Sequence, residues 1–161
     1  MKDNPTVKEK SLNPNHAALR SPQKEIASEE QSAALDERIL TALGAASEKK
    51  AIDIVVLDLR AVASFTDYFV ITSGANQRQV QAISDEVADK LKQAGTSAAR
   101  IEGYRTAEWI LLDYGDFIVH VFDEKSRRFY DLERLWREGK RVELPNEFAN
   151  QGVSSLRKNR D

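Results

Sequence analysis

The chain has 161 residues, 41% of them hydrophobic and 31% charged, which suits one soluble domain with a core better than two domains. It contains no cysteine, which excludes disulfides, thiol nucleophiles and thiolate metal sites and fits a reducing cytosol. The formal net charge of −2 gives no global attraction to nucleic acid. No apolar run is long enough to span a bilayer, so we expect a cytoplasmic protein without a membrane partner.

Both ends of the chain are polar. Residues 1–31 contain three prolines and no apolar period, so we expect a disordered N-terminal tail. Residues 1–30 carry five basic and five acidic side chains, unlike an organelle-targeting sequence, which is poor in acids. The polar residues 145–161 are expected to form a flexible C-terminal tail. The folded domain is therefore predicted at 32–144.

The first half of this domain predicts a helix followed by two strands. Apolar residues recur at helical spacing over 35–43, and Gly44 is placed to end that helix. The segments 53–59 and 68–72 are short and rich in branched apolar residues, as buried strands are.

A second helix and three further strands are expected next. Asn76 and Gln79 have the spacing of a capping box at the start of an amphipathic helix. Residues 100–104 are a weak strand candidate. The segments 109–113 and 117–122 are strong candidates, and the short connection between them predicts a hairpin.

One last helix is predicted after the hairpin. Asp131 can cap it, Gly139 can end it, and Leu132, Leu135 and Trp136 are expected to face the core. The element order is then α-β-β-α-β-β-β-α. Runs of strands between helices favour an α/β fold with a mixed sheet flanked by helices.

The hairpin combines acidic and apolar side chains. Residues 106–124 contain five acids and no Lys or Arg. Alternation puts Trp109, Leu111 and Asp113 on one strand face, and burying Asp113 unpaired would be costly. We therefore expect Trp109 and Leu111 to be partly exposed, as an interface anchor whose acidic neighbours select a basic partner. The alternative, with Trp109 in the core and Asp113 merely at the strand end, stays open.

Other residue patterns give no sign of catalysis. His120 alternates with apolar residues and is interpreted as structural. One histidine in the fold cannot assemble a familiar zinc site, and Asp113 with Asp116 makes a weak cation site. The turn at 73–75 lacks the known phosphate-loop spacings. We predict no catalytic residues, metal or cofactor. The dense basic stretch 127–141 is interrupted by acids, which favours a solvated helix over an RNA contact.

Five segments resemble the ribosomal silencing factors, also called the RsfS or Iojap family. They read DIVVLDL (53–59), TDYFVITSG (66–74), RQVQAISDEV (78–87), AEWILLDYGDFIVHVF (107–122) and RRFYDLERLW (127–136). These segments follow the family's order and spacing and cover nearly the whole predicted domain. The departures are small, such as Asn76 where a serine is usual and Ser84 where an alanine is usual.

This resemblance implies a nucleotidyltransferase-like fold and a function without chemistry. Members bind the large ribosomal subunit through its protein fourteen at the subunit interface. They block joining of the small subunit and repress translation when nutrients are short. For this chain the resemblance also leaves room for minor ribosomal RNA contacts and for a homodimer of the free protein.

The contact residues follow from the matching segments. The implied contacts are Trp109, Ile110 and Leu111, with Asp113 and Asp116 as acidic partners. Tyr68 and Tyr130 are weaker candidates from neighbouring segments.

The fold likeness supplies an alternative, an active or vestigial metal-dependent nucleotidyltransferase. Such enzymes need a Gly-Ser turn opening a helix and an Asp-x-Asp pair on a following strand to hold metal ions. Here Leu111 stands where the first carboxylate is expected, and only Asp113 remains. The sequence thus favours a fold kept without its catalysis. Direct RNA binding is a third hypothesis, with steep salt dependence as its signature.

Overall fold

The structure, a computed structural model, describes residues 35–149. The predicted N-terminal tail, 1–31, lies outside the described residues, as does most of the predicted C-terminal tail. The chain divides after Leu35, and the fold below belongs to the unit that begins at Asp36.

Mixed helices and strands make up this unit. In chain order they are α2 (Glu37–Glu48), β1 (Ile52–Asp58), β2 (Tyr68–Gly74), α3 (Gln77–Gln93), β3 (Arg100–Glu102), β4 (Trp109–Asp113), β5 (Phe117–Asp123), α4 (Glu124–Tyr130), α5 (Leu132–Leu135), β6 (Lys140–Arg141) and α6 (Asn146–Ala149).

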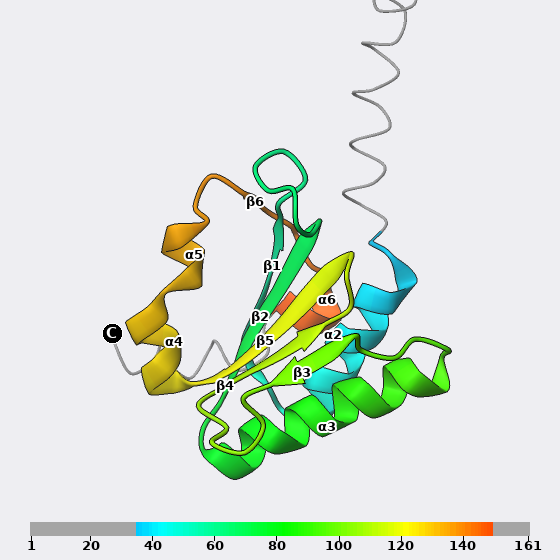
Figure 1. The fold of residues 1–161 in the computed structure, drawn as a ribbon, viewed down its shortest axis with the longest axis vertical. Helices are drawn as coiled ribbons and strands as arrows, with labels where there is room; N and C mark the ends of the chain where they lie inside the picture. Colours follow the sequence, from blue (N-terminus) through cyan, green and yellow to red (C-terminus); the bar gives the residue numbers. More distant parts are fainter. Residues whose placement is uncertain (1–34, 150–161) are drawn as a thin grey trace, which may run out of the picture. The chain divides into compact units, whose positions relative to one another are not determined.

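The strands form one six-stranded sheet in the order β3-β4-β5-β2-β1-β6 (Figure 1). β2 and β5 are parallel, with Tyr68 opposite Phe117 and Gly74 opposite Asp123. All other neighbours are antiparallel, including the predicted hairpin of β4 and β5. The mixed sheet with flanking helices confirms the predicted fold class.

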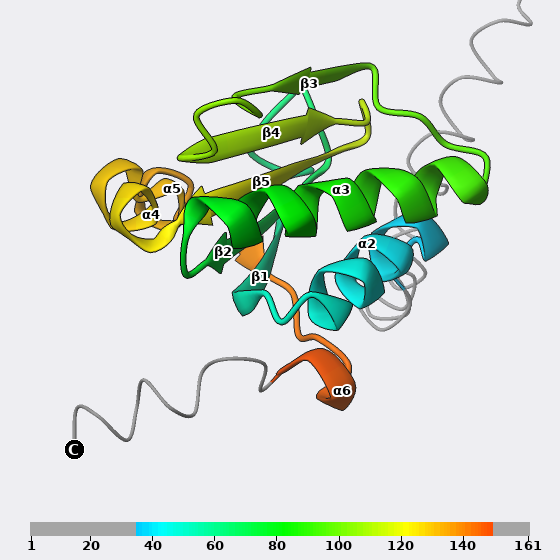
Figure 2. The same cartoon turned by 90° about the horizontal axis from the view of Figure 1, so that it is seen from below.

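Helices α2 and α3 lie side by side along one face of the sheet, and α4 and α5 lie away from them (Figure 2). The amphipathic pattern of α3 explains this packing: Val80, Ile83, Val87 and Leu91 are fully buried. Burial of such side chains contributes about 1.5–3 kcal/mol each. This side of the sheet therefore has a closed core.

The start of α3 is fixed by the predicted capping pair. The Asn76 side chain accepts a hydrogen bond from the Gln79 N–H at 2.9 Å. Gln79 Oε1 accepts from the Ala75 N–H at 2.6 Å, and Gln79 Nε2 donates to the carbonyls of Lys49 and Lys50. Gln79 thereby ties the turn after β2 to the loop before β1, which gives this turn a structural role.

The prediction that Gly44 ends the first helix is wrong. α2 continues through it to Glu48. A glycine inside a helix costs only about 1 kcal/mol relative to alanine, and the flanking residues Leu43, Ala45 and Ala46 are all buried. Their packing outweighs the local preference.

The prediction of one last helix from Asp131 to Gly139 is only partly correct, because α5 begins after Asp131 but ends at Leu135. Asp123 caps a separate helix, α4, and Asp131 ends it in the left-handed conformation with φ +49°. Its side chain makes no capping bond to α5. Because α5 is a single turn, Leu132 is buried while Leu135, predicted for the core, is 68% exposed.

Two short elements at the end of the described chain carry no periodic sequence signal. β6 has two residues and pairs with β1. α6 lies inside the predicted C-terminal tail, 145–161, yet its Phe148 is buried. The described fold thus extends past 144, because one aromatic anchor suffices to hold a four-residue helix.

Candidate docking surface

The sheet face opposite α2 and α3 is apolar and only partly covered. Its buried residues are Val55, Leu57, Leu59, Phe69, Ile71, Ile118, Phe122 and Leu132, and partly buried side chains, including Trp109, Leu111 and Trp136, pack against them. α4 and α5 cover part of this face. Exposed apolar area of this kind marks interaction sites in soluble proteins.

Aromatic side chains form a continuous band on this face. Ring-centroid distances are 5.7 Å for Phe65–Trp136, 6.0 Å for Trp136–Phe69, 4.4 Å for Phe69–His120, 5.9 Å for His120–Trp109, 4.7 Å for Trp109–Tyr130 and 5.0 Å for Tyr130–Phe129. We call these seven residues the aromatic band. Its outer members are open to solvent, with Phe65 56%, Tyr130 48% and Phe129 78% exposed. Rings of this size anchor protein interfaces.

Trp109 lies within this band with a fixed orientation. It is half-buried, and β4 alternates between half-buried and buried side chains as predicted. Its ring stacks on Phe122 at 5.0 Å, and its indole Nε1 donates to His120 Nδ1 at 3.0 Å. Both sequence interpretations of Trp109 hold in part, because one side of the ring packs inward while some of it stays exposed.

His120 supports that orientation. It is 3% exposed, and burial lowers its pKa to about 3. The imidazole is therefore neutral at neutral pH, and its Nδ1 can accept a hydrogen bond from the indole N–H. Its Nε2 has no hydrogen-bond partner among the described residues. The sequence interpretation of His120 as structural missed this contact. Strand register could have found it, because His120 is the diagonal cross-strand neighbour of Trp109.

Asp113 and Asp116 lie at the other end of the hairpin. Asp113 is four residues along β4 from Trp109, which corresponds to about 13 Å at the usual strand rise. Its carboxylate accepts from the Gly115 N–H at 2.8 Å and pairs with Arg100 at 3.4 Å. The two acids therefore do not flank Trp109, and turn geometry and ion pairing account for Asp113.

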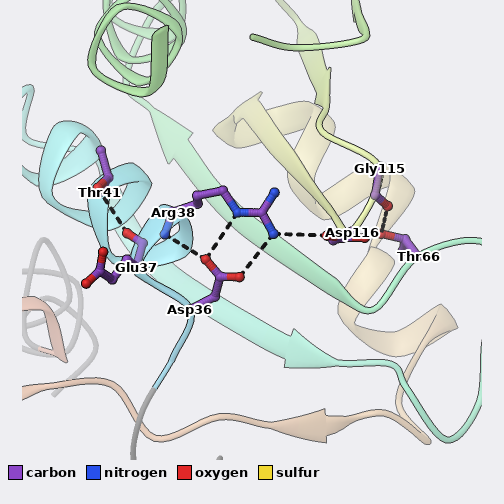
Figure 3. A network of polar contacts seen from close by, with 7 residues as sticks. All are labelled: Asp36, Glu37, Arg38, Thr41, Thr66, Gly115 and Asp116. Carbon is purple, nitrogen blue, oxygen red and sulfur yellow. Dashed lines mark hydrogen bonds and ion pairs between the residues drawn. The ribbon is translucent and has the colours of Figure 1, made fainter. Parts of the chain in front are cut away.

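Asp116 belongs to a network that joins the hairpin turn to α2 (Figure 3). Arg38 bridges Asp36 and Asp116, both at 3.0 Å, and its guanidinium lowers the pKa of Asp36. Thr66 donates to the Gly115 carbonyl at 2.8 Å in the same turn. Asp116 thus anchors the turn, although its side chain remains 68% exposed.

Two further predicted contacts, Ile110 and Tyr68, do not belong to the aromatic band. Ile110 points to the opposite side of β4 and is fully buried, so its side chain is not part of the surface in this fold. Tyr68 begins β2, where the Arg60 guanidinium lies 5.3 Å from its ring and burial raises its pKa.

Two further carboxylates, Glu108 and Asp123, lie at the strand ends next to the Trp109–Phe122 pair. Glu108 precedes β4, and Asp123, which ends β5, donates its N–H to the Glu108 carbonyl at 2.9 Å. Both line a cleft of about 510 Å³ together with Phe129 and Tyr130 and with the cations Lys125 and Arg128. This end of the aromatic band therefore carries charges of both signs and lacks the purely acidic character that the sequence predicts.

An arginine lies beside the end of β2, where it lines a cleft of about 270 Å³. Arg127 is buried and donates to Ser73 Oγ and to Glu133, each at 2.9 Å, with Asp53 3.9 Å away. Within residues 35–149, no group of three or more histidine, aspartate or glutamate side chains is placed to hold a metal ion. In the same range no helix is long and apolar enough to cross a membrane.

Fold and surface together define a class: a small α/β protein with a nearly closed helical side and an open aromatic sheet face suited to docking. Comparison with known proteins gives the family. Residues 28–161 match the family model described as "Ribosomal silencing factor during starvation". The chain belongs to this family of ribosomal silencing factors.

Individual relatives agree with this assignment. "Ribosomal silencing factor RsfS" of Halalkalibacterium halodurans is 39% identical over 108 residues, covering 67% of this chain and 92% of the relative. The mouse "Mitochondrial assembly of ribosomal large subunit protein 1" is 32% identical over 92 residues, covering 55% and 40%. A crystal structure of a Bacillus halodurans protein matches with a TM-score of 0.61 at 39% identity, covering 67% of this chain and 98% of that one.

Proposed function

We propose that this protein represses translation by docking its aromatic band onto the large ribosomal subunit, where it sterically prevents joining of the small subunit. Membership of the silencing factors supports a regulatory role at the ribosome. The name of the mouse relative refers to the large subunit. The observation that carries the proposal is the aromatic band, in which the buried rings of Phe69 and His120 connect rings that remain partly or largely exposed.

The proposed partner on the subunit is ribosomal protein fourteen at the subunit interface. The cleft beside Tyr130 is lined by Glu108 and Asp123 and by Lys125 and Arg128, so it can pair with groups of either charge on that protein, and complementary charge speeds and orients docking. Trp109 and Leu111 supply the apolar centre and Tyr130 extends it. Asp113, Asp116 and Tyr68 would act at the margin of the contact.

The role is proposed to be non-enzymatic and cytoplasmic, and strongest under nutrient limitation. Steric occupation needs only affinity and bulk, so no catalytic group is required. The missing carboxylate supports this account over the nucleotidyltransferase alternative, since Leu111 stands where such enzymes need the first metal-binding aspartate.

The test is co-sedimentation of purified variants with isolated large subunits. Trp109→Ala should weaken binding about 30-fold, the loss expected at an aromatic interface anchor worth about 2 kcal/mol. Phe129→Ala should also weaken binding. Because the Phe129 side chain is 78% exposed, its removal should leave the fold intact, and a loss of binding would report on the contact itself. Ile101→Ala removes a 46% exposed apolar side chain from β3, outside the band, and should bind normally. Equal binding by all three variants would overturn the docking face.

A further inference from the structure

Many arginines of this fold are held by carboxylates. The closest ion-pair distances are 3.0 Å for Arg38–Asp116, 2.8 Å for Arg60–Asp58, 3.4 Å for Arg100–Asp113 and 2.9 Å for Arg127–Glu133. In these pairs the positive charge serves internal structure. Among the described residues several other arginines, Arg78, Arg105 and Arg128 among them, form no such ion pair, so a candidate for binding an external anion must also be a cluster of cations.

One such group follows α5. Residues 134–141 carry four cations, Arg134, Arg137, Lys140 and Arg141, and a single acid, Glu138. All five side chains are exposed. Within the described part of the chain, none of the three arginines forms an ion pair with a carboxylate. We call 134–141 the basic segment. Its formal charge is +3, four cations minus one acid, on a chain of net −2.

The backbone of the basic segment is fixed. The Arg137 N–H donates to the Arg134 carbonyl at 3.2 Å, and the Gly139 N–H donates to the Trp136 carbonyl at 2.9 Å. Gly139 lies so close to β1 that an added Cβ would stand 2.7 Å from a Leu59 methyl. Arg141 then pairs with Leu57 in the sheet. The cations are thus presented from an ordered turn, which lowers the entropy lost on binding.

The basic segment begins where the aromatic band ends. Trp136 belongs to both, and its ring contacts Phe65 and Phe69 on the open sheet face. Leu135, 68% exposed, lies between the first two cations in sequence. Groups that surround a partner seated on the aromatic band would therefore lie close to these guanidinium groups.

We propose that the basic segment binds the phosphate backbone of ribosomal RNA beside the protein to which the aromatic band docks. The proposal rests on the proposed function, because a ribosomal protein in place is bordered by RNA. Arginine suits phosphate through its forked donors. Backbone phosphate contacts position a protein without reading sequence, which fits a factor that needs one orientation on the subunit.

The test compares two triple variants of the full chain. Arg134→Ala, Arg137→Ala and Arg141→Ala together remove the proposed phosphate contacts. Arg78→Ala, Lys92→Ala and Arg105→Ala remove three exposed cations elsewhere, so both variants have the same net charge. Affinity for isolated large subunits and for protein-free large-subunit RNA is measured between 50 and 200 mM salt.

The wild type and the control variant should lose about 20- to 40-fold more affinity over this salt range than the basic-segment variant, as three phosphate contacts to single-stranded or duplex RNA require. Equal salt slopes for the two variants would overturn the proposal. So would a loss confined to intact subunits, since the cations would then contact an acidic protein. Failure of the proposed function looks different: the wild type would not bind subunits at all, while the arm with protein-free RNA would still compare the variants.

Discussion

The contact between Trp109 and His120 shows how one buried polar side chain serves an exposed one. The indole needs an acceptor to hold its inner edge, and the neutral imidazole supplies it at 3.0 Å. Burial keeps the pKa of His120 near 3, so protonation does not interrupt this bond at neutral pH. The same burial should lower the stability of the folded state when the solution becomes acidic.

This predicts a pH-dependent stability with a definite sign. In the unfolded chain the pKa of His120 is about 6.5, so below this pH the unfolded state binds a proton at His120 that the folded state does not bind. The free energy of unfolding should therefore fall by about 2 kcal/mol between pH 7.5 and pH 5 from this group. Urea unfolding at the two pH values measures it. His120→Gln, which keeps an acceptor but does not titrate, should show a smaller decline, and an equal decline would refute the assignment.

At the scale of elements, two glycines show opposite demands of the backbone. Gly44 lies inside α2 with nothing within 4 Å of an added Cβ. Gly103, after β3, has φ +82°, and an added Cβ would collide with the Trp109 carbonyl oxygen. Gly44 lowers the stability of its helix without serving a close contact, whereas Gly103 allows β3 to approach the start of β4.

Alanine substitutions at these two positions should shift stability in opposite directions. Gly44→Ala should stabilise the protein by about 0.5–1 kcal/mol, because it removes backbone freedom from the unfolded chain. Gly103→Ala should destabilise it by more than the roughly 1–2 kcal/mol of left-handed strain alone, because the collision adds to it. Thermal unfolding of both variants checks this, and a Gly103→Ala protein as stable as the wild type would contradict the close approach.

Across the whole molecule, strong periodic patterns predicted the sheet, α3 and the β4–β5 hairpin, because each buries a full apolar stripe. The patterns could not predict α4, whose cap at Asp123 competes with a plausible cap at Asp131. The assignment of Ile110 as a contact came from the family motif, whereas strand alternation puts its side chain on the buried face of β4. The aromatic band lay beyond sequence reasoning, because Phe65, Trp109 and Trp136 meet only through the tertiary fold.

The most direct test of the account is where the full chain migrates in a sucrose gradient with separated and joined ribosomal subunits. Docking at the subunit interface predicts that the protein travels with free large subunits, is absent from joined ribosomes and reduces their number when the subunits are mixed. Migration with joined ribosomes, or no migration with large subunits, would contradict it.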